Sequence, residues 1–358
     1  MDSATYPLFV AAGSPRELGV QHGEQAADRI HAFLDFLASS LRLSRETMRE
    51  RALRFRPLFE KVCPHLLEEI DGLAEGAKLN PADALVVQLR GELAMLPEGA
   101  CTTFVVSRRG TSNGETLIGQ TSDTPREIMD VGYVLRMEPT DRPALLMWTF
   151  GGMIGYHGLN EHGVAHFANA LGGGPPWRFA LSHYPLKRLM LEQRSLDDVL
   201  ALMRKVRVCS NGNYVLCDGD DRIADVELTS AGPEVLDEKR DGFLVHANHF
   251  LCVAHACPEN HAQSLPDSFC RQERMTKLVA DRFGSINVDD MKAALADHDG
   301  HPTGICRHPH DGPDHSMLDR RGCTVAAIIA EPARRRLHVC RGNPCENAFV
   351  EYVMHGDK

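Results

Sequence analysis

The chain lacks the features that would place it in a membrane or on nucleic acid. No stretch approaches the ~18 apolar residues that a membrane-spanning helix needs. Basic residues are fewer than acidic ones, 39 against 49, and the formal net charge of −10 argues against a nucleic-acid binder, which would carry a basic patch. Residues 1–14 contain no basic stretch followed by an apolar one, as a secretion signal would. We therefore expect a cytoplasmic protein that binds neither membrane nor nucleic acid.

Repeats, low-complexity tracts and linkers are also missing, so the 358 residues form either one large domain or two ordinary ones. The chain contains no Cys-x-x-Cys pair, the motif typical of zinc ribbons and dithiol oxidoreductases. The eleven cysteines are an odd number and cannot all pair within the chain. In a cytoplasmic protein most of them are expected to be reduced, buried thiols, and a catalytic cysteine needs further context to be recognised.

The first hundred residues favour helices. Ser14-Pro15 and Asn80-Pro81 each place a capping residue before a proline, and Pro64 begins a run with apolar residues at helical spacing. From Cys101 the pattern changes to β-branched strands interrupted by helices. Strands are expected at residues 101–107, 116–120, 132–137, 144–150, 164–168, 213–217, 223–228, 242–246, 323–330 and 336–340, and helices at 184–194, after 195, at 268–281 and at 288–296. This order indicates an α+β fold with helices layered on antiparallel sheets.

Cys101 opens the first of these strands, directly after the small residues Gly99 and Ala100. The position is typical of an enzyme that cuts its own chain so that the nucleophile becomes a new N-terminus. A free α-amine has an ordinary pKa near 7.7–8.0, close to the pH at which a general base works best. Because the amine and the thiol lie on one residue, the nucleophile needs no separate histidine.

Asn113-Gly114 is a strong signal for a two-residue hairpin turn, since both residues accept a positive φ. Such a turn would pair position 104 with Asp123 and leave this carboxylate roughly 10 Å along the sheet from Cys101. A bulge would bring Asp123 closer, where it would hold the new ammonium group. The alternative is that Asp123 caps the turn at Asp123-Thr-Pro125, and the hairpin itself favours neither role.

Seven short segments follow one another along the chain: GACTTF, IGQTSD, GLNEHGVAHFANAL, VHANHF, PDSFCRQERM, GICRH and RGNPC. In this order they resemble the acyl-coenzyme A:6-aminopenicillanic acid acyltransferase family of autoproteolytic cysteine enzymes, which are related to choloylglycine hydrolases. The start of the chain, with Pro15-Arg-Glu-Leu-Gly19 and His22-Gly23, also fits the leader segment of that family. The resemblance therefore spans nearly the whole chain.

The resemblance implies a cut between Ala100 and Cys101. The cut would produce a helical leader of residues 1–100 as a small subunit and a catalytic domain of residues 101–358. It further implies the four-layer αββα sandwich of N-terminal-nucleophile hydrolases, a heterodimer of the two cleavage products with or without further oligomerisation, and no cofactor.

Matched motif by motif, the resemblance makes Cys101 the nucleophile and Asp123 the acid near its amine. Asn248 resembles the asparagine of the oxyanion hole, with Asn169 as a second candidate, and loss of such a donor costs about 2.7–4 kcal/mol of barrier. Arg307 resembles an arginine beside the nucleophile, where it would lower the pKa of the thiol or hold a substrate carboxylate.

Thr121 and Ser122 stand where family members usually carry Asn-Trp. The loss of an aromatic pocket wall disfavours a bulky penicillin-like or phenylacetyl substrate, and we expect Thr102, Thr121 and Ser122 to contact the substrate. Glu227 and Arg271 also match family positions. We interpret these two as a structural ion pair and not as catalytic groups.

A histidine-rich stretch of the loop at residues 297–321 offers imidazole and carboxylate groups in a short span. It contains His308, His310, Asp311, Asp314 and His315, with Pro309 and Pro313 between them. The prolines prevent a helical ligand spacing, so we favour a solvated loop. Cys340 and Cys345 have no second cysteine pair at zinc spacing, and we expect ordinary thiols and no metal site.

Together these patterns predict an autoprocessed cysteine enzyme in which Cys101 attacks a small-molecule N-acyl amide or thioester. Water then gives hydrolysis, which we favour slightly, and an amine gives transfer. An acyl-coenzyme A-dependent N-acyltransferase with an amine acceptor is one alternative. A binding protein that kept the fold but lost the chemistry, and a metal-dependent hydrolase, are two others.

Overall fold

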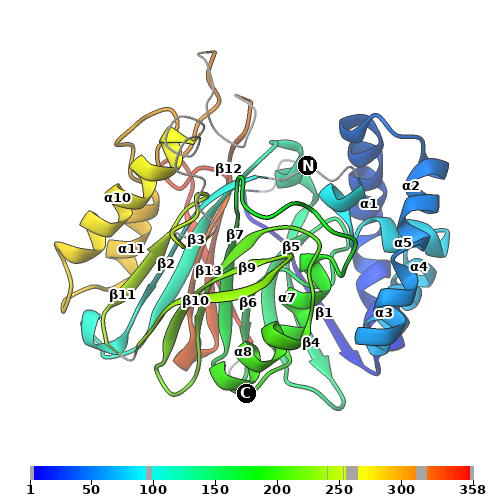
Figure 1. Ribbon diagram of the computed structural model, residues 1–358, viewed down its shortest axis with the longest axis horizontal. Helices are drawn as coiled ribbons and strands as arrows, with labels where there is room; N and C mark the ends of the chain where they lie inside the picture. Colours follow the sequence, from blue (N-terminus) through cyan, green and yellow to red (C-terminus); the bar gives the residue numbers. More distant parts are fainter. Residues whose placement is uncertain are drawn as a thin grey trace.

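Two β-sheets packed face to face form the centre of the molecule (Figure 1). The computed structural model describes residues 4–93, 99–239, 241–252, 254, 265–311 and 321–354. One sheet has eight strands, in spatial order β1 (Leu8–Gly13), β4 (Gly132–Pro139), β5 (Leu145–Phe150), β6 (His157–Asn160), β7 (Ala165–Ala170), β8 (Gly212–Cys217), β9 (Ile223–Thr229) and β10 (Gly232–Lys239). The other has six, in the order β11 (Phe243–His246), β2 (Ala100–Val106), β3 (Leu117–Thr124), β12 (Cys323–Glu331), β13 (Arg336–Arg341) and β14 (Phe349–Val353).

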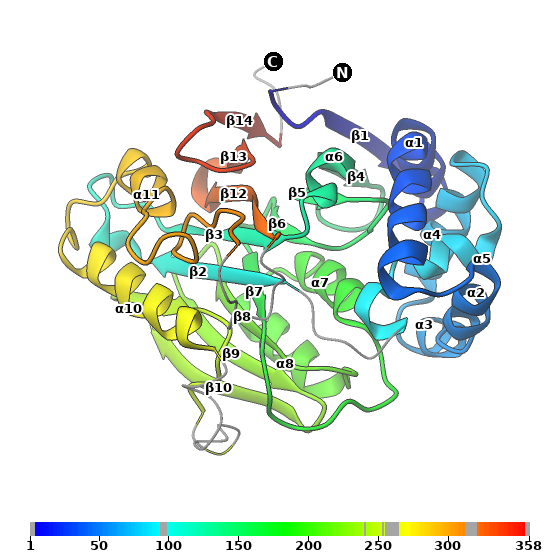
Figure 2. The ribbon, with the colours of Figure 1, turned by 90° about the horizontal axis from the view of Figure 1, so that it is seen from above.

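A layer of helices covers the outer face of each sheet (Figure 2). Helices α7 (His183–Leu191) and α8 (Leu196–Lys205) pack on the eight-stranded sheet. Helices α10 (Pro266–Ala280) and α11 (Val288–Leu295) pack on the six-stranded sheet. The short helix α6 (Glu127–Val131) and two 3₁₀ turns (Arg108–Gly110 and Pro332–Arg334) lie in connections. The order of layers confirms the αββα sandwich that the family resemblance implies.

The segment before Cys101 forms a stack of helices beside the eight-stranded sheet. It contains α1 (Pro15–Leu41), α2 (Arg45–Leu53), α3 (Arg56–Val62), α4 (Pro64–Gly76), α5 (Pro81–Val86) and a 3₁₀ turn at Arg90–Leu93. The predicted starts at Ser14 and Asn80 are confirmed, because Ser14 forms a capping box with Glu17 and Asn80 Oδ1 accepts the N–H of Ala82 over 2.9 Å. The prediction of an all-helical leader is wrong at β1. This strand runs parallel to β4 and supplies the hydrogen-bonding partner that the edge of the sheet needs.

Contacts of Tyr6 join the leader to the six-stranded sheet. The Tyr6 hydroxyl donates to the carbonyl of Val325 over 2.9 Å, and the Tyr352 hydroxyl donates to the carbonyl of Tyr6 over 2.5 Å. Both tyrosine side chains are buried. The leader therefore contacts both sheets, through the pairing of β1 with β4 in one and through Tyr6 in the other.

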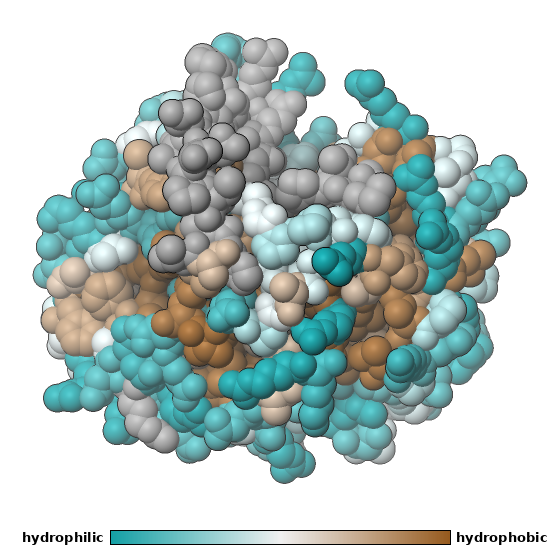
Figure 3. All heavy atoms as spheres, viewed as in Figure 1, coloured by the Kyte–Doolittle hydropathy of each residue, from teal (hydrophilic) through white to brown (hydrophobic). Residues whose placement is uncertain are grey.

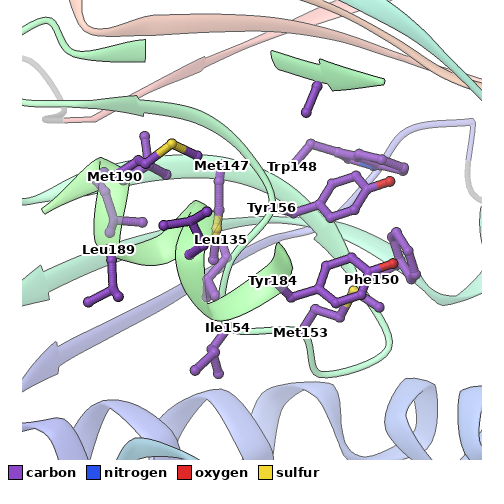
Figure 4. Packing of buried hydrophobic residues seen from close by; sticks show 14 of the residues in the cluster. Leu135, Met147, Trp148, Phe150, Met153, Ile154, Tyr156, Tyr184, Leu189 and Met190 are labelled. Atoms are coloured by element: carbon purple, nitrogen blue, oxygen red, sulfur yellow. The ribbon is translucent and has the colours of Figure 1, made fainter. Parts of the chain in front are cut away.

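The larger of two hydrophobic cores fills the space between the sheets and continues under the leader helices. Figure 4 shows part of it, where Trp148 and Phe150 of β5 lie beside Tyr156 and Tyr184. A smaller core lies between the six-stranded sheet and the helices α10 and α11. On the face shown in Figure 3, hydrophobic patches lie among hydrophilic side chains, which dominate the outline. None of the described helices combines the length and the apolarity that crossing a bilayer requires.

Candidate active site

The hairpin of β2 and β3 pairs Ala100 with Asp123 and Cys101 with Ser122. The predicted two-residue turn at Asn113-Gly114 is wrong. The strands end at Val106 and Leu117, and residues 107–116 connect them through a 3₁₀ turn. Within this connection the Thr111 hydroxyl donates to the carbonyl of Glu115 over 2.9 Å and closes a small loop around Asn113 and Gly114. Asp123 consequently lies opposite Ala100 and not at the level of position 104.

Side chains of paired residues in an antiparallel hairpin point to the same face of the sheet. Cys101 faces the space between the two sheets, where it lines a cavity. Thr102 faces the layer of α10, since its Oγ1 accepts a hydrogen bond from Arg271 over 2.9 Å. Asp123 shares this second face with Thr102 and Thr121. The thiol and the carboxylate therefore lie on opposite faces near one end of the hairpin.

Asn248 and Arg271 hold the backbone of Cys101. The N–H of Cys101 donates to Asn248 Oδ1 over 3.1 Å, and its carbonyl accepts from Arg271 Nη1 over 2.6 Å. Arg271 Nη2 also donates to Asn248 Oδ1 over 2.8 Å. Asn248 Nδ2 donates to the carbonyl of Ala170 over 2.9 Å. The residue predicted as the nucleophile and the one predicted as the oxyanion donor are thus in direct contact.

Arg271 belongs to this site, whereas the sequence predicts a structural ion pair between Arg271 and Glu227. The expected pair of Arg271 with Glu227 is absent from the ion pairs of the described residues. Arg271 instead contacts Asp267 one helical turn earlier, with 3.0 Å between Nη2 and Oδ2. Glu227 lies 3.2 Å from His246 and accepts the N–H of Leu251 over 2.5 Å. The family motif containing Arg271 was the only available signal, and a motif does not say what its residue touches.

A buried network surrounds the carboxylate of Asp123. Thr324 Oγ1 donates to Asp123 Oδ1 over 2.7 Å and accepts the N–H of Arg307 over 2.9 Å. The guanidinium of Arg307 lies 3.6 Å from Asp267 Oδ2. Burial raises the pKa of Asp123 from 3.8 to about 6, although Arg271, the bond from Thr324 and then Arg307 oppose the shift. Asp123 and Arg307 are therefore brought into one network.

Burial also raises the pKa of the Cys101 thiol, to about 12, and the negative charge of Asp123 adds to this shift. Lys187 and Arg271 act in the opposite direction. The resemblance implies that Arg307 lowers the pKa of the thiol, whereas in the structure the guanidinium with this effect is that of Arg271. The cost of burying the thiolate charge is larger and raises the pKa overall. In the continuous chain the thiol is protonated at neutral pH.

The cavity beside Cys101 has a volume of about 340 Å³. Its walls carry aromatic and charged side chains from separate parts of the chain, namely Arg90, Glu92, Tyr156, Trp177, Tyr184 and Lys187. The ammonium of Lys187 lies 4.4 Å from the ring centroid of Tyr156 and 5.2 Å from that of Tyr184. None of these residues was singled out from the sequence, because no local motif contains them. Aromatic walls are present although position 122 is a serine.

The remaining predicted site residues lie close to Cys101 but differ in their access to the cavity. Asn169 lines it, and its Nδ2 donates to Thr103 Oγ1 over 3.1 Å and to the carbonyl of Ala247 over 2.8 Å. Thr102, Thr121 and Ser122 are buried and are not among the described residues that line the cavity.

Comparisons with known proteins show what this chain is similar to. A sequence model described as acyl-coenzyme A:6-aminopenicillanic acid acyl-transferase matches residues 110–346. The acyl-coenzyme A:6-aminopenicillanic-acid-acyltransferase 40 kDa form of Emericella nidulans is 27% identical over 355 residues, covering 96% of this chain and 94% of that protein. Among solved structures, a mutant of conjugated bile acid hydrolase from Clostridium perfringens aligns with a TM-score of 0.46 and 12% identity over 70% of this chain and 96% of that one. Penicillin V acylase from Agrobacterium tumefaciens aligns with a TM-score of 0.37 and 10% identity over 68% of this chain and 75% of that one.

Proposed function

Because this chain belongs to the acyl-coenzyme A:6-aminopenicillanic acid acyl-transferase family, we propose that it is a self-cleaving cysteine enzyme that hydrolyses or transfers the acyl group of a small amide or thioester. Cys101 is the proposed nucleophile. The observation that supports this most directly is the position of Cys101 in the cavity wall, with its N–H hydrogen-bonded to Asn248. The same contacts would serve both self-cleavage and catalysis.

In the proposed activation, Cys101 Sγ attacks the carbonyl carbon of Ala100. The bond from this carbon to the nitrogen of Cys101 breaks, and the thiol proton ends on the departing amine. Water then hydrolyses the thioester, which releases the carboxylate of Ala100 and restores the thiol. The backbone favours a bend at this site because Gly99 has a φ of +77°, a conformation that glycine adopts readily.

In the cleaved enzyme the new α-amine accepts the thiol proton, since its ordinary pKa of about 7.7–8.0 suits a base at neutral pH. The thiolate of Cys101 attacks the substrate carbonyl, and the NH₂ group of Asn248 donates to the oxyanion. The ammonium then protonates the leaving group, which is an amine from an amide or a thiol from a thioester, and the acyl group remains as a thioester on Cys101. Water resolves this thioester by hydrolysis, and a bound amine resolves it by transfer.

Residues 1–100 would stay attached after the cut as the smaller partner of a heterodimer. Strand β1 contributes a full edge to the eight-stranded sheet, and Tyr6 is bonded to Val325 and Tyr352 of the larger fragment. The leader helices also share the main hydrophobic core with the sheets. Two fragments that share one hydrophobic core are expected to remain together as a permanent complex.

The cavity suggests the substrate class. Its volume lies at the lower end of the range of small-molecule sites. Tyr156 and Tyr184 offer flat apolar surfaces, and the ammonium of Lys187 over them is suited to a carboxylate. We propose an amide or thioester with a small apolar group and a carboxylate near the reacting carbonyl.

Intact mass spectrometry of the freshly folded protein tests the proposal. The wild-type chain should separate under denaturing conditions into fragments of residues 1–100 and 101–358 that co-purify before denaturation. Cys101→Ala should remain one chain. Cys270→Ser is the matched control, because Cys270 is exposed on α10 and should not affect cleavage.

Incubation with paired N-acyl amides and acyl thioesters, with and without a carboxylate, should then give a mass increase of one acyl group on the fragment that begins with Cys101. Addition of an amine acceptor distinguishes transfer from hydrolysis by the product formed. A single uncut wild-type chain whose Cys101 reacts with neither substrate nor alkylating agent would overturn the proposal and favour a binding protein that kept the fold.

A further inference from the structure

Four side chains converge near the surface, in the loop that follows α11 and in the turn after β13. They are His298, Cys306 and His308 of the loop and Cys345 of the turn. Their ligand atoms all lie within 4.8 Å of one another. Cys306 is buried, His308 is half-buried, and His298 and Cys345 are exposed. We propose that these residues form a structural metal site that binds Zn²⁺.

Four of the six separations between the ligand atoms are close to those around a tetrahedral zinc ion, and the other two, from His298 to the two sulfurs, are no longer than 4.8 Å. With Zn–S near 2.3 Å and Zn–N near 2.0–2.1 Å, a regular tetrahedron places two sulfurs about 3.8 Å apart, a sulfur and a nitrogen about 3.6 Å apart and two nitrogens about 3.4 Å apart. The two sulfurs, of Cys306 and Cys345, are 3.6 Å apart. His308 Nε2 lies 3.6 Å from the sulfur of Cys306 and 3.4 Å from that of Cys345. The Nε2 atoms of His298 and His308 are 3.1 Å apart.

The kinds of ligand also favour zinc. Two thiolates and two imidazoles form a common structural zinc set, whereas calcium and magnesium prefer oxygen ligands. A disulfide would require the sulfurs of Cys306 and Cys345 to approach to about 2.05 Å, and they lie well beyond that distance. Four protein ligands complete the tetrahedron, so the proposed ion has no open position for a substrate and holds the chain together without taking part in the reaction.

Neighbouring groups would support the ligands as outer-shell partners do in metal sites. Asn343 Nδ2 lies 3.3 Å from the sulfur of Cys306, where its N–H can donate to a thiolate, and it donates to the carbonyl of Arg307 over 2.7 Å. The Nδ1 atom of His308 lies 4.0 Å from a carboxylate oxygen of Glu346. Asn343 and Glu346 come from the same turn as Cys345, so the turn supplies one ligand and both supports.

The proposed ion has a consequence for the active site, because Arg307 lies between the ligands Cys306 and His308. The N–H of Arg307 donates to Thr324, and its guanidinium faces Asp267. An ion that ties both neighbours of Arg307 to the turn after β13 would fix this arginine in the network of Asp123. The metal would therefore position a site residue through the backbone.

This site departs from the sequence-based expectation of no metal site. Of the potential ligands in the histidine-rich stretch, only His308 is a ligand of the proposed ion. Asp314 and His315 lie outside the described residues. The sequence predicts an ordinary thiol at Cys345, because Cys340 and Cys345 have no second cysteine pair at zinc spacing. The other three proposed ligands are distant from Cys345 in the sequence. The strand β13 and the turn after it bring Cys345 back to the loop.

Metal analysis of the purified full chain tests the proposal. After desalting under reducing conditions, inductively coupled plasma mass spectrometry should find about one zinc per chain in the wild type. Cys345→Ser and His298→Ala should each lose most of it. Two matched controls should keep it: Cys270→Ser, an exposed cysteine on α10, and His301→Ala, whose ring lies 5.4 Å from that of His308 but outside the four ligands.

Cobalt provides a readout that needs neither the variants nor activity. Chelator-treated wild-type protein should bind one Co²⁺ with the strong visible absorption of tetrahedral thiolate coordination, and added Zn²⁺ should displace it. Chelation should lower the melting temperature of the wild type and leave that of Cys345→Ser unchanged. Wild-type protein that contains no zinc and takes up neither Zn²⁺ nor Co²⁺, or that carries a Cys306–Cys345 disulfide as isolated, would overturn the metal site without affecting the role proposed for Cys101.

Discussion

The side-chain oxygen of Asn248 accepts hydrogen bonds both from the N–H of Cys101 and from the guanidinium of Arg271. Two donors on one oxygen fix which way the amide group is turned. The NH₂ group is therefore presented on the other side, where one N–H donates to Ala170. A donor held in a fixed orientation suits the role at the oxyanion that we propose for Asn248.

Asn248→Ala should lower kcat by about 10²–10³-fold with a much smaller change in KM, since the lost donor acts mainly in the transition state. Asn169→Ala is the matched comparison. The NH₂ group of Asn169 already serves Thr103 and Ala247, so its loss should cost about 1–3 kcal/mol of unfolding free energy and little of kcat. Steady-state kinetics and urea unfolding of both variants check this. A larger kcat loss in Asn169→Ala would exchange the two assignments.

Arg271→Met should lower the free energy of unfolding by about 3–5 kcal/mol, because it leaves the buried carboxylate of Asp267 without its closest positive charge. Arg274→Met on the same helix is the control. Its partner is Asp297 and its side chain is 29% exposed, so about 1 kcal/mol or less is expected. Urea unfolding in the Cys101→Ala background measures both. The double variant Asp267→Leu/Arg271→Met, which removes both buried charges, should recover part of the loss. An unfolding free energy for Arg271→Met that falls no more than that for Arg274→Met would mean that the Arg271 network does not stabilise the fold.

The elements near Cys101 show what a sequence can and cannot predict. Local signals gave the helix start at Ser14 and the strand at Cys101, because capping and β-branched residues act within a few positions. The register predicted for Asp123 is wrong, since the connection at residues 107–116 is long and depends on contacts that no turn motif specifies. Strands such as β1 and β14 were missed, because an edge strand forms only where another strand offers partners.

The candidate site divides in the same way. The family motifs predict roles for Cys101, Asp123 and Asn248, and the structure places the three around one end of the hairpin. The cavity walls with Lys187, and the cluster that includes Cys345, could not be predicted. Their members lie in separate segments, and only the completed tertiary structure brings them together.

The carboxyl group of Asp123 should make stability depend on pH. Its pKa is raised in the folded chain from 3.8 to about 6, so the folded state binds the proton more tightly than the unfolded state does. The contribution to stability is therefore complete below pH 3.8 and is lost as the pH rises through about 6, by about 3 kcal/mol in total. Urea unfolding of Cys101→Ala between about pH 4 and 7 should show this loss relative to Cys101→Ala/Asp123→Asn, in which the amide does not titrate. Parallel curves for the two proteins would contradict the raised pKa.

Glycines let the leader helices α1 and α4 approach each other closely. A Cβ atom on Gly19 would lie 1.9 Å from the carbonyl oxygen of Glu69, and one on Gly72 would lie 2.3 Å from that of Arg16. Gly19→Ala should therefore force the helices apart and lower the free energy of unfolding by about 3 kcal/mol. Helix propensity alone predicts the opposite sign, a gain of about 1 kcal/mol.

Gly114→Ala is the control in the same urea unfolding assay. A Cβ atom there meets nothing within 4 Å, but the φ of +69° is strained, so the substitution should cost only about 1 kcal/mol. A Gly19→Ala protein as stable as the parent would show that α1 and α4 can separate without loss, and that the leader is not held by this contact.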